Sequence, residues 1–275
     1  MILLPDFKRA ITNDSRQALR TWHTGIPYCS WEGVDCSDPK HPGRVTGLNL
    51  EDLALSGMIS PSLGNLTFLL RLELSHNGFT GVIPPFNRLQ RLKFLDLRYN
   101  SLQGINPDTL TNCSNLRYLS LSGNLLIGEV RSGIDLLSNL VWLDLSFNNL
   151  TGEIPPSLKN SSQLEHISLD DNKLTRTIPD ELGKLPNLSH LLLYENRLSG
   201  HLPASLGNIS GLEWLDLSFN NFVGQVPSSF GNLGLLQHLN LQQNNFSGFI
   251  PGVLGGLQHL TNLYLSDNNL EGGVP

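Results

Sequence analysis

Aromatic and imidazole side chains recur in this sequence at a nearly constant spacing, and rings of this kind often form ligand-contact surfaces. The interval is 24 residues, except for 23 residues between Arg71 and Phe94. The column consists of Gly47, Arg71, Phe94, Tyr118, Trp142, His166, His190, Trp214, His238 and Asn262. Five positions further along, a second column adds Tyr99, Phe147 and Phe219. Exposed rings in a row predict a binding surface, although the same rings also suit β-strands as packing residues.

Charged residues beside these columns separate by sign along the chain. The basic ones come first and are Arg71, Lys93, Arg98 and Arg117. The acidic ones follow and are Asp144, Glu165, Asp170, Asp171, Glu195, Glu213 and Asp216. Two signs along one face favour an elongated ligand that lies in one direction, and chance segregation on a solvated surface is the alternative. Because His166 and His190 lie between two tryptophans, we also expect binding to change as the pH crosses about 6.5.

The sequence contains no recognisable catalytic motif. The sequence has no phosphate-binding loop, no His-Glu-x-x-His zinc motif and no nucleophile elbow. Asp96, Asp144 and Asp216 share one column, but they belong to a repeated Leu-Asp-Leu word and not to an acid–base pair. The sequence therefore predicts no enzymatic activity, no metal site and no cofactor.

Three cysteines are present, and their positions indicate different roles. Cys29 and Cys36 are close together before the first repeat, with no ligand-spaced partners for a metal, so they predict a disulfide that staples the N-terminal segment. Cys113 occupies a column that elsewhere holds Leu66 and Ile209, which predicts a buried free thiol.

A repeated unit positions all of these residues. Aligned on one asparagine, the chain contains ten copies of L-x-x-L-x-L-x-x-N-x-L-x-G-x-I-P that begin near Val45. Alternating leucines such as Leu215 and Leu217 predict a short strand with one buried face, and Asn220 can satisfy backbone groups where the chain turns away. A single unit cannot bury its leucines, so the copies must stack. The shorter interval implies a one-residue deletion near residues 85–88.

Residues 1–43 differ from the repeats and predict an N-terminal cap, whereas residues 44–275 predict about ten repeats, the last of them truncated. Leu3, Leu4, Phe7 and Ile11 have helical spacing, and a second helix is expected to start near Asn13, Asp14 and Ser15. The chain ends inside the tenth copy without a capping pattern, so we expect further repeats in the parent protein and faster fraying at that end.

Composition excludes several partners and favours an extracellular location. The net charge is −6, without a basic run, which argues against nucleic acid, and no apolar stretch is long enough to span a membrane. Asn-x-Ser/Thr sequons, which start at eight asparagines, favour a glycoprotein, although the repeat pattern could create them by chance. One sequon starts at Asn13, and the sites expected to carry glycans are Asn65, Asn112, Asn149, Asn160, Asn187, Asn208 and Asn245.

The motifs CSWEGVDCS, HPGRVTGLNL and LSGMISPSLGNLTFLLRLELSHNGFTGVIP resemble the start of a plant leucine-rich-repeat receptor kinase ectodomain. ISPSLGNLTFL and LTNCSNL are most similar to the subfamily that includes immune receptors of grasses. The resemblance covers essentially the whole chain. It implies an α/β solenoid: a right-handed superhelix of plant-type repeats, a parallel β-sheet on the concave face and a helical, disulfide-stapled cap.

The resemblance also implies a function. We expect an extracellular recognition module at the plasma membrane that binds a peptide or protein ligand on the concave face, together with a co-receptor ectodomain, for defence or developmental signalling. A cytoplasmic Ser/Thr kinase follows in complete family members. The alternative is a secreted inhibitor of cell-wall-degrading enzymes, similar to the polygalacturonase inhibitors. The sequence names neither the ligand nor the co-receptor.

Overall fold

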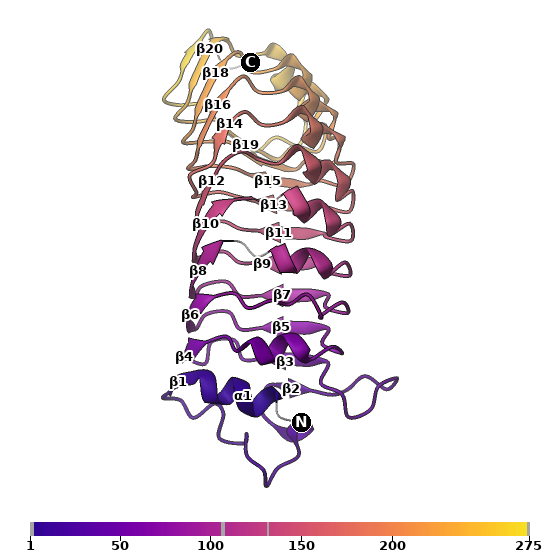
Figure 1. Ribbon diagram of the computed structural model, residues 1–275. Coiled ribbons are helices and arrows are strands. Elements are labelled where there is room, and N and C mark those ends of the chain that lie inside the picture. The colour runs from indigo at the N-terminus through magenta and orange to yellow at the C-terminus, as the bar shows by residue number, and fades with distance from the viewer. Residues whose placement is uncertain (1–2, 106–107, 131, 274–275) are drawn as a thin grey trace. The chain divides into compact units, whose positions relative to one another are not determined.

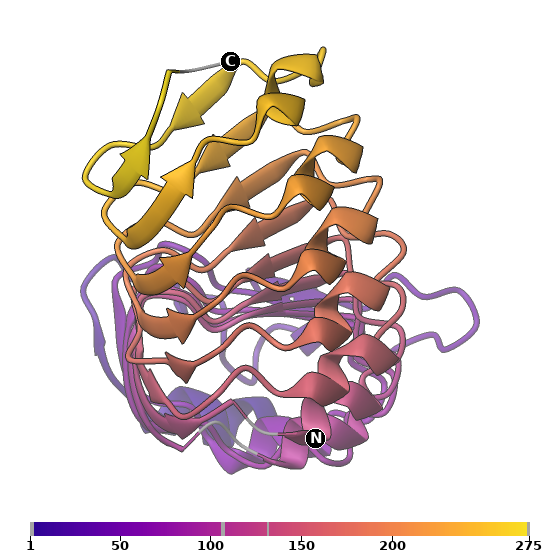
Figure 2. The same ribbon diagram turned by 90° about the horizontal axis from the view of Figure 1, so that it is seen from above.

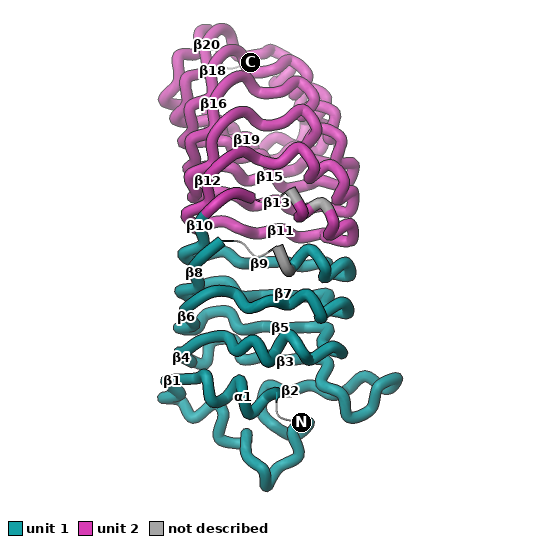
Figure 3. The backbone as a smooth tube through the Cα atoms, in the orientation of Figure 1, with its two compact units in different colours: residues 1–127 teal, residues 128–275 magenta. Residues whose placement is uncertain are grey.

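The computed structural model describes residues 3–105, 108–130 and 132–273. The chain forms two compact units, Met1–Ile127 and Gly128–Pro275 (Figure 3). Within each unit, a repeat consists of a short strand, an asparagine turn and a second strand, and most repeats then add a 3₁₀-helical turn (Figure 1). The alternating leucines account for the first strand of each repeat. In a strand, alternate side chains point to the same face, and Leu215 and Leu217 are both fully buried on that face.

The described residues of unit 1 form strands of two sheets and four short helices. The first sheet has the order β2 (Val34–Asp35), β3 (Gly47–Asn49), β5 (Arg71–Glu73), β7 (Phe94–Asp96) and β9 (Tyr118–Ser120). The second has the order β1 (Ile11–Asp14), β4 (Leu55–Met58), β6 (Gly78–Val82), β8 (Ser101–Ile105) and β10 (Leu125–Glu129). The described helices are α1 (Leu3–Ala10), η1 (Tyr28–Ser30), η2 (Pro61–Asn65) and η3 (Asp108–Asn112).

Unit 2 repeats one pattern throughout. Its first sheet consists of parallel strands β11 (Trp142–Asp144), β13 (His166–Ser168), β15 (His190–Leu192), β17 (Trp214–Asp216), β19 (His238–Asn240) and β21 (Asn262–Tyr264). The second strands are β12 (Asn149–Thr151), β14 (Thr175–Arg176), β16 (Arg197–Gly200), β18 (Asn221–Gly224), β20 (Asn245–Phe249) and β22 (Asn269–Glu271). Seen from above, the short helices form one row apart from the strands (Figure 2). They are η4 (Ser132–Leu136), η5 (Pro156–Asn160), η6 (Asp180–Lys184), η7 (Ala204–Asn208), η8 (Ser228–Asn232) and η9 (Gly252–Gly256).

The repeat asparagine joins neighbouring coils, as the sequence predicts. The Asn220 side-chain amide donates to the carbonyls of Leu217, Ser218 and, one repeat earlier, Leu193, at 2.9–3.3 Å. Its oxygen accepts the Leu198 N–H at 2.9 Å. Asn196 and Asn244 make the same set of bonds. One buried side chain therefore satisfies backbone groups of two repeats at once.

The N-terminal cap covers the core of unit 1 with aromatic side chains. Phe7, Trp22 and Trp31 are buried, and the rings of Trp22 and Trp31 stack at 5.2 Å between centroids. Phe7 also lies 6.0 Å from Phe79, a core residue of the second repeat. The cap also adds one strand to each sheet, because β2 pairs antiparallel with β3 and β1 pairs antiparallel with β4. These strands hydrogen-bond to the first repeat strands, whose backbones would otherwise form sheet edges.

The prediction of a second helix in the cap is wrong. Residues 11–14 form β1 instead, and turns follow up to the single 3₁₀ turn η1. Asp14 does organise the turn, because its carboxylate accepts the N–H groups of Ala18 and Leu19 at 2.7 and 3.0 Å. The backbone of Ile11–Asp14 pairs antiparallel with β4, and this tertiary contact takes the place of the hydrogen bonds that a helix would make.

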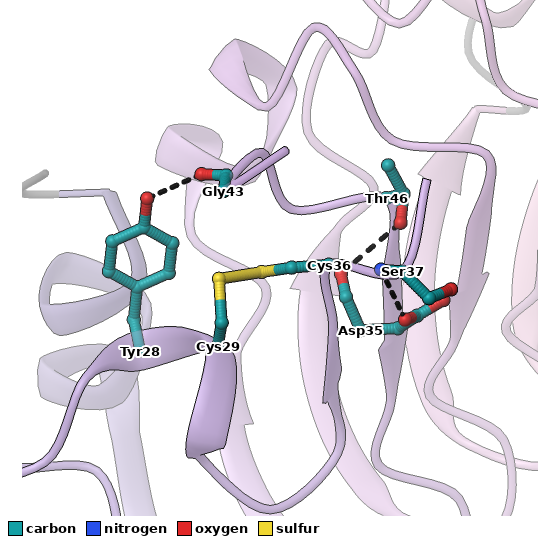
Figure 4. The surroundings of a disulfide bond; sticks show 7 residues. All are labelled: Tyr28, Cys29, Asp35, Cys36, Ser37, Gly43 and Thr46. Carbon is teal, nitrogen blue, oxygen red and sulfur yellow. Dashed lines mark hydrogen bonds between the residues drawn. A yellow bond between two sulfur atoms is a disulfide. The ribbon is translucent and has the colours of Figure 1, made fainter. Parts of the chain in front are cut away.

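The predicted disulfide is confirmed. Cys29 and Cys36 are bonded across a sequence separation of 7 residues, and their Cα atoms are 5.6 Å apart (Figure 4). Next to it, the Tyr28 hydroxyl donates to the Gly43 carbonyl at 2.5 Å. The disulfide therefore ties η1 to the end of β2, the strand that the cap adds to the first sheet.

Two further expectations agree with the structure. Cys113 is a buried free cysteine, and burial raises the pKa of its thiol to about 11. In the repeat that is one residue shorter, residues 85–93 contain no 3₁₀ turn, whereas the neighbouring repeat of unit 1 forms η2 at the equivalent place. The missing residue therefore removes the helical turn and leaves the strands in register.

Replacement of Asn220 by alanine tests the role of the asparagine bonds. The change leaves buried carbonyls and the Leu198 N–H without partners, and an orphaned buried group costs roughly 1–3 kcal/mol. We expect Asn220→Ala to lower the free energy of unfolding by about 2 kcal/mol or more in urea denaturation. The matched control is Asn221→Ala at the exposed neighbouring position, which should change it by less than about 0.5 kcal/mol. Equal effects of the two changes would contradict this role.

The tenth repeat should exchange its amide hydrogens faster than the middle of unit 2. Leu263, Leu265 and Leu270 are only half-buried, whereas Leu215 and Leu217 are fully buried. Less buried apolar area gives less stabilisation, at about 25 cal/mol per Å². Hydrogen exchange followed by mass spectrometry should show lower protection in residues 260–271 than in residues 188–220. Equal protection in the two segments would contradict this expectation.

Candidate ligand-binding surface

The predicted ring column is continuous on the first sheet of unit 2. Trp142, His166, His190, Trp214 and His238 are partners in adjacent strands and form what we call the ring ladder. Trp142 stacks on His166 at 3.6 Å between ring centroids, and Trp214 stacks on His238 at 3.9 Å. His190 lies 5.5 Å from His166 and 6.4 Å from Trp214. The parallel register brings together side chains that are 24 residues apart in the sequence.

Exposure divides the ladder into contact and support residues. Trp142 and Trp214 are 37% and 39% exposed, and His190 is half-buried. His166 and His238 are each only 8% exposed because a tryptophan covers one face of each ring. A ligand on this surface can therefore touch the two indoles, while the two buried imidazoles hold the indoles in place.

The two buried imidazoles both have lowered pKa values. Burial lowers the pKa of His166 to about 4, and the nearby His190 lowers it further, whereas Asp144 opposes the shift. Burial also lowers the pKa of His238, and Asp216 opposes that shift. The expected response of His166 near pH 6.5 is therefore wrong, because this side chain is neutral at any pH well above 4.

The second predicted column of rings lies at the turns after β7, β11 and β17. Tyr99, Phe147 and Phe219 are exposed by 49%, 43% and 38%. Their φ angles are 51–54°, in the left-handed region that bulky residues rarely adopt. Backbone bonds to the next repeat support this conformation in unit 2, since the N–H groups of Phe147 and Phe219 each donate at 3.0 Å to the carbonyls of Asp170 and Gln242. The two rings are thus presented from a fixed backbone.

Unit 1 carries a separate patch of predicted site residues. The Arg71 guanidinium carbon lies 4.3 Å from the Phe94 ring centroid, and Phe94 stacks on Tyr118 at 4.2 Å. Tyr99 packs against His76 at 4.6 Å. The basic residues here are less available than the sequence suggests, because Arg71 pairs with Glu73 at 3.1 Å.

Arg98 follows the same pattern, since it pairs with Asp96 at 3.4 Å and with Glu51 at 3.7 Å. Local carboxylates therefore reduce the positive field of unit 1.

The first sheet of unit 2 has the opposite character. Positions two to eight of its six repeats hold carboxylates but no lysine or arginine. The carboxylates are Asp144, Glu165, Asp170, Asp171, Glu195, Glu213, Asp216 and Asp267. Together with the ring ladder and with Phe147 and Phe219, this side of the sheet is called the unit 2 strand face. Its charge is negative, and the lysines and arginines of the described unit lie on η5, η6, β14, β16 and the turn at Lys173.

Sequence reasoning missed two features of this face. Tyr264 is 42% exposed and packs against His238 at 5.4 Å, although its column elsewhere holds mainly polar residues. Asp170 is almost fully buried, and burial raises its pKa to about 6, while hydrogen bonds from Ser168 and Tyr194 hold the carboxylate form. The serine two residues before Asp170 was the available signal for such a bond, but its burial required the structure.

Most of the predicted glycosylation sites lie on the surface. Asn149 is half-buried and accepts a hydrogen bond from Lys173 at 2.8 Å. Asn187 is exposed, and its amide donates to the Ser162 carbonyl at 2.9 Å. The other predicted sites are exposed and are Asn65, Asn112, Asn160, Asn208 and Asn245. None of these asparagines belongs to a first-sheet strand, so glycans there would leave the unit 2 strand face accessible.

The described residues contain neither a metal-binding cluster nor a helix that could span a membrane. Among residues 3–105, 108–130 and 132–273, no group of three or more histidine, cysteine, aspartate or glutamate side chains could hold a metal ion. The helices in the same ranges also lack the length and apolar character of a membrane span.

Sequence families support the repeat assignment over most of the chain. A family described as "Leucine-rich repeat region" matches residues 72–221, and one described as "Leucine rich repeat" matches residues 210–270. A third, "Leucine rich repeat N-terminal domain", matches residues 3–37.

Curated relatives are receptor kinases of plants. A putative receptor-like protein kinase of Arabidopsis thaliana is 47% identical over 81 residues, which are 30% of this chain and 8% of the relative. The receptor kinase-like protein Xa21 of Oryza sativa subsp. japonica is 42% identical over 80 residues, 28% of this chain and 8% of the relative. The alignments thus span less than a tenth of the length of these relatives.

Solved structures match over nearly the whole chain. The ectodomain of the receptor kinase GASSHO1/SCHENGEN3 from Arabidopsis thaliana, in complex with CASPARIAN STRIP INTEGRITY FACTOR 2, has a TM-score of 0.95 and 38% identity, covering 100% of this chain and 33% of that one. The Arabidopsis receptor kinase HAESA, in complex with the peptide hormone IDA and the co-receptor SERK1, has a TM-score of 0.67 and 29% identity. The match covers 98% of this chain and 53% of that one. The chain therefore belongs to the leucine-rich-repeat family and is similar, within it, to the ectodomains of plant leucine-rich-repeat receptor-like kinases.

Proposed function

We propose that this chain is the extracellular ligand-recognition region of a plant leucine-rich-repeat receptor-like kinase, and that it binds a peptide or protein for defence or developmental signalling. The observation that carries the proposal is the pair of exposed indoles, Trp142 and Trp214, which lie in one column of the same sheet and stack on buried imidazoles. The similarity to a ligand-bound receptor ectodomain over the full chain supports it. Rigid aromatic side chains lose little entropy on binding, so they suit this role.

The proposed contacts differ in their roles. On unit 2 we assign Trp142, Trp214, Phe147 and Phe219 to direct contact because they are exposed. His190 is an additional, half-buried contact, and His166 and His238 support the indoles. On unit 1, Arg71, Phe94, Tyr118 and Tyr99 form a second candidate patch.

Further partners and location belong to the same proposal. A co-receptor ectodomain is proposed because a neighbour of known structure binds the co-receptor SERK1. The chain would lie on the extracellular side of the plasma membrane, with glycans at the exposed sequons. Its own role would be recognition and not catalysis, since the matched families describe leucine-rich repeats.

The inhibitor alternative is less favoured. Receptor kinases are the curated relatives, and the receptor ectodomain with a TM-score of 0.95 covers the entire chain. A secreted inhibitor would have to act through the same strand face. The identity of the bound molecule, and not the fold, therefore distinguishes the two functions.

The proposal is tested by selection and mutation. A random-sequence dodecapeptide library displayed on phage would be selected against the secreted chain, and dissociation constants measured for the selected peptides. We expect Trp142→Ala and Trp214→Ala each to weaken binding by about 30-fold, which corresponds to about 2 kcal/mol for an aromatic hot spot.

The matched control is Phe249→Ala on β20. Phe249 is an equally apolar ring, 69% exposed, but it belongs to the second strand of its repeat. Its removal should leave affinity unchanged. Selected peptides that bind both tryptophan variants as tightly as the parent would refute recognition by the unit 2 strand face.

A further inference from the structure

The unit 2 strand face combines exposed rings with carboxylates, and positions two to eight of its repeats hold no lysine or arginine. Its rings and carboxylates alternate on the same strands, as shown by Trp214 and Asp216 on β17. Glu213 precedes that strand directly, and Glu165 precedes β13 in the same way. The side chains that donate to these acids are neutral. Gln237 donates to Glu213 at 3.0 Å, and Asp216 accepts from Asn240 at 3.1 Å and from the Ser218 hydroxyl at 2.6 Å and N–H at 3.0 Å.

Unit 1 shows which chemical group fits such a surface. Arg71 lies over the Phe94 ring at 4.3 Å and at the same time pairs with Glu73 at 3.1 Å. The arginine and the ring belong to the ring column, and Glu73 lies two residues after Arg71 on β5. Trp214 and Asp216 place a ring and a carboxylate in the same two columns, but both lie on β17, where Trp214 occupies the position that Arg71 has on β5. A guanidinium from outside could make both contacts.

A buried polar atom next to Asp216 adds an independent observation. His238 is 8% exposed, and its Nε2 has no hydrogen-bond partner. This nitrogen faces the Asp216 carboxylate across 3.9 Å. A separation of 3.9 Å is too long for a hydrogen bond, so the His238 nitrogen occupies no acceptor site of the Asp216 carboxylate.

We propose that the ligand of the unit 2 strand face is an extended cationic peptide, whose arginine or lysine side chains pack on Trp214 and pair with Glu213 and Asp216. This proposal rests on the proposed function, since it specifies the chemistry of the ligand for the same surface. A cation over an indole is attracted by the ring, and the neighbouring carboxylates add a directional ion pair. A neutral or acidic peptide would lack both interactions.

The test uses four synthetic heptapeptides that differ only in charge. Their sequence is X-Gly-X-Gly-X-Gly-X with both ends blocked, where X is arginine, lysine, glutamine or glutamate. Fluorescence anisotropy with the whole chain should show that the arginine peptide binds at least tenfold more tightly than the glutamine peptide. The glutamate peptide should not bind. Equal binding of the arginine and glutamine peptides, or no binding of either at millimolar concentration, would overturn the proposal.

Matched variants separate this site from general attraction between charges. The double variant Glu213→Gln with Asp216→Asn keeps acceptors for Gln237 and Ser218 and should weaken the arginine peptide at least tenfold. The control Glu153→Gln with Glu181→Gln removes the same charge away from the face, from residues near β12 and in η6, and should have little effect. An equal loss in both double variants would mean nonspecific attraction and would overturn the proposal. Circular dichroism melting checks that each variant is folded.

The phage selection described above distinguishes failure of this inference from failure of the proposed function. Selected peptides that need Trp214 but carry no net positive charge, and that tolerate the Glu213/Asp216 double variant, would refute only the cationic ligand. Selected peptides that ignore both tryptophans would refute recognition on this face altogether. Selected peptides that are basic and sensitive to both changes would support the two proposals together.

Discussion

The hydrogen bonds of one asparagine per repeat are the constraint on which the rest of each unit depends. Asn220 ties its own turn to the carbonyl of Leu193 and to the N–H of Leu198 in the preceding repeat. Both are backbone groups in the buried interior. There, leaving a donor or acceptor without a hydrogen bond destabilises the fold by more than a typical hydrogen bond stabilises it. The bond set therefore fixes the position of each coil against its neighbour, and the leucines below it then stack in columns.

Because the strand register is fixed, residues at equivalent positions of successive repeats contact each other. Residues that are 24 positions apart become neighbours across a strand pair, and this is why Trp214 and His238 stack at 3.9 Å. Stacking also divides the roles within one column, since each tryptophan covers an imidazole and remains partly exposed itself. Burial lowers the pKa of the two covered histidines, His166 and His238, so these side chains provide shape and apolar contact beneath the indoles.

Charge on the two units follows from local partners as much as from composition. In unit 1, Arg71 and Arg98 lie close to carboxylates, so their positive charge is largely compensated. On the unit 2 strand face, Glu213 and Asp216 accept hydrogen bonds from neutral amides, so their charge remains. A ring next to an unneutralised carboxylate is the arrangement that distinguishes the unit 2 face as a site for a basic group.

The sequence alone determined the repeat, the alternating strands, the asparagine bonds, the disulfide and the column of rings. The disulfide follows from the close spacing of Cys29 and Cys36 before the first repeat, and the other features follow from spacing that recurs every 24 residues, because stacked copies must present equivalent residues to one another. The tertiary structure decided the features that depend on neighbours in space, which are side-chain exposure, charge compensation and the secondary structure of the cap. Pairing with β4 made Ile11–Asp14 a strand and not a helix start, and stacking buried His166 while leaving Trp142 exposed. The partners of Arg71 and the burial of Asp170 likewise depend on which side chains lie beside them in space, since exposure and charge compensation are properties of neighbours and not of sequence position.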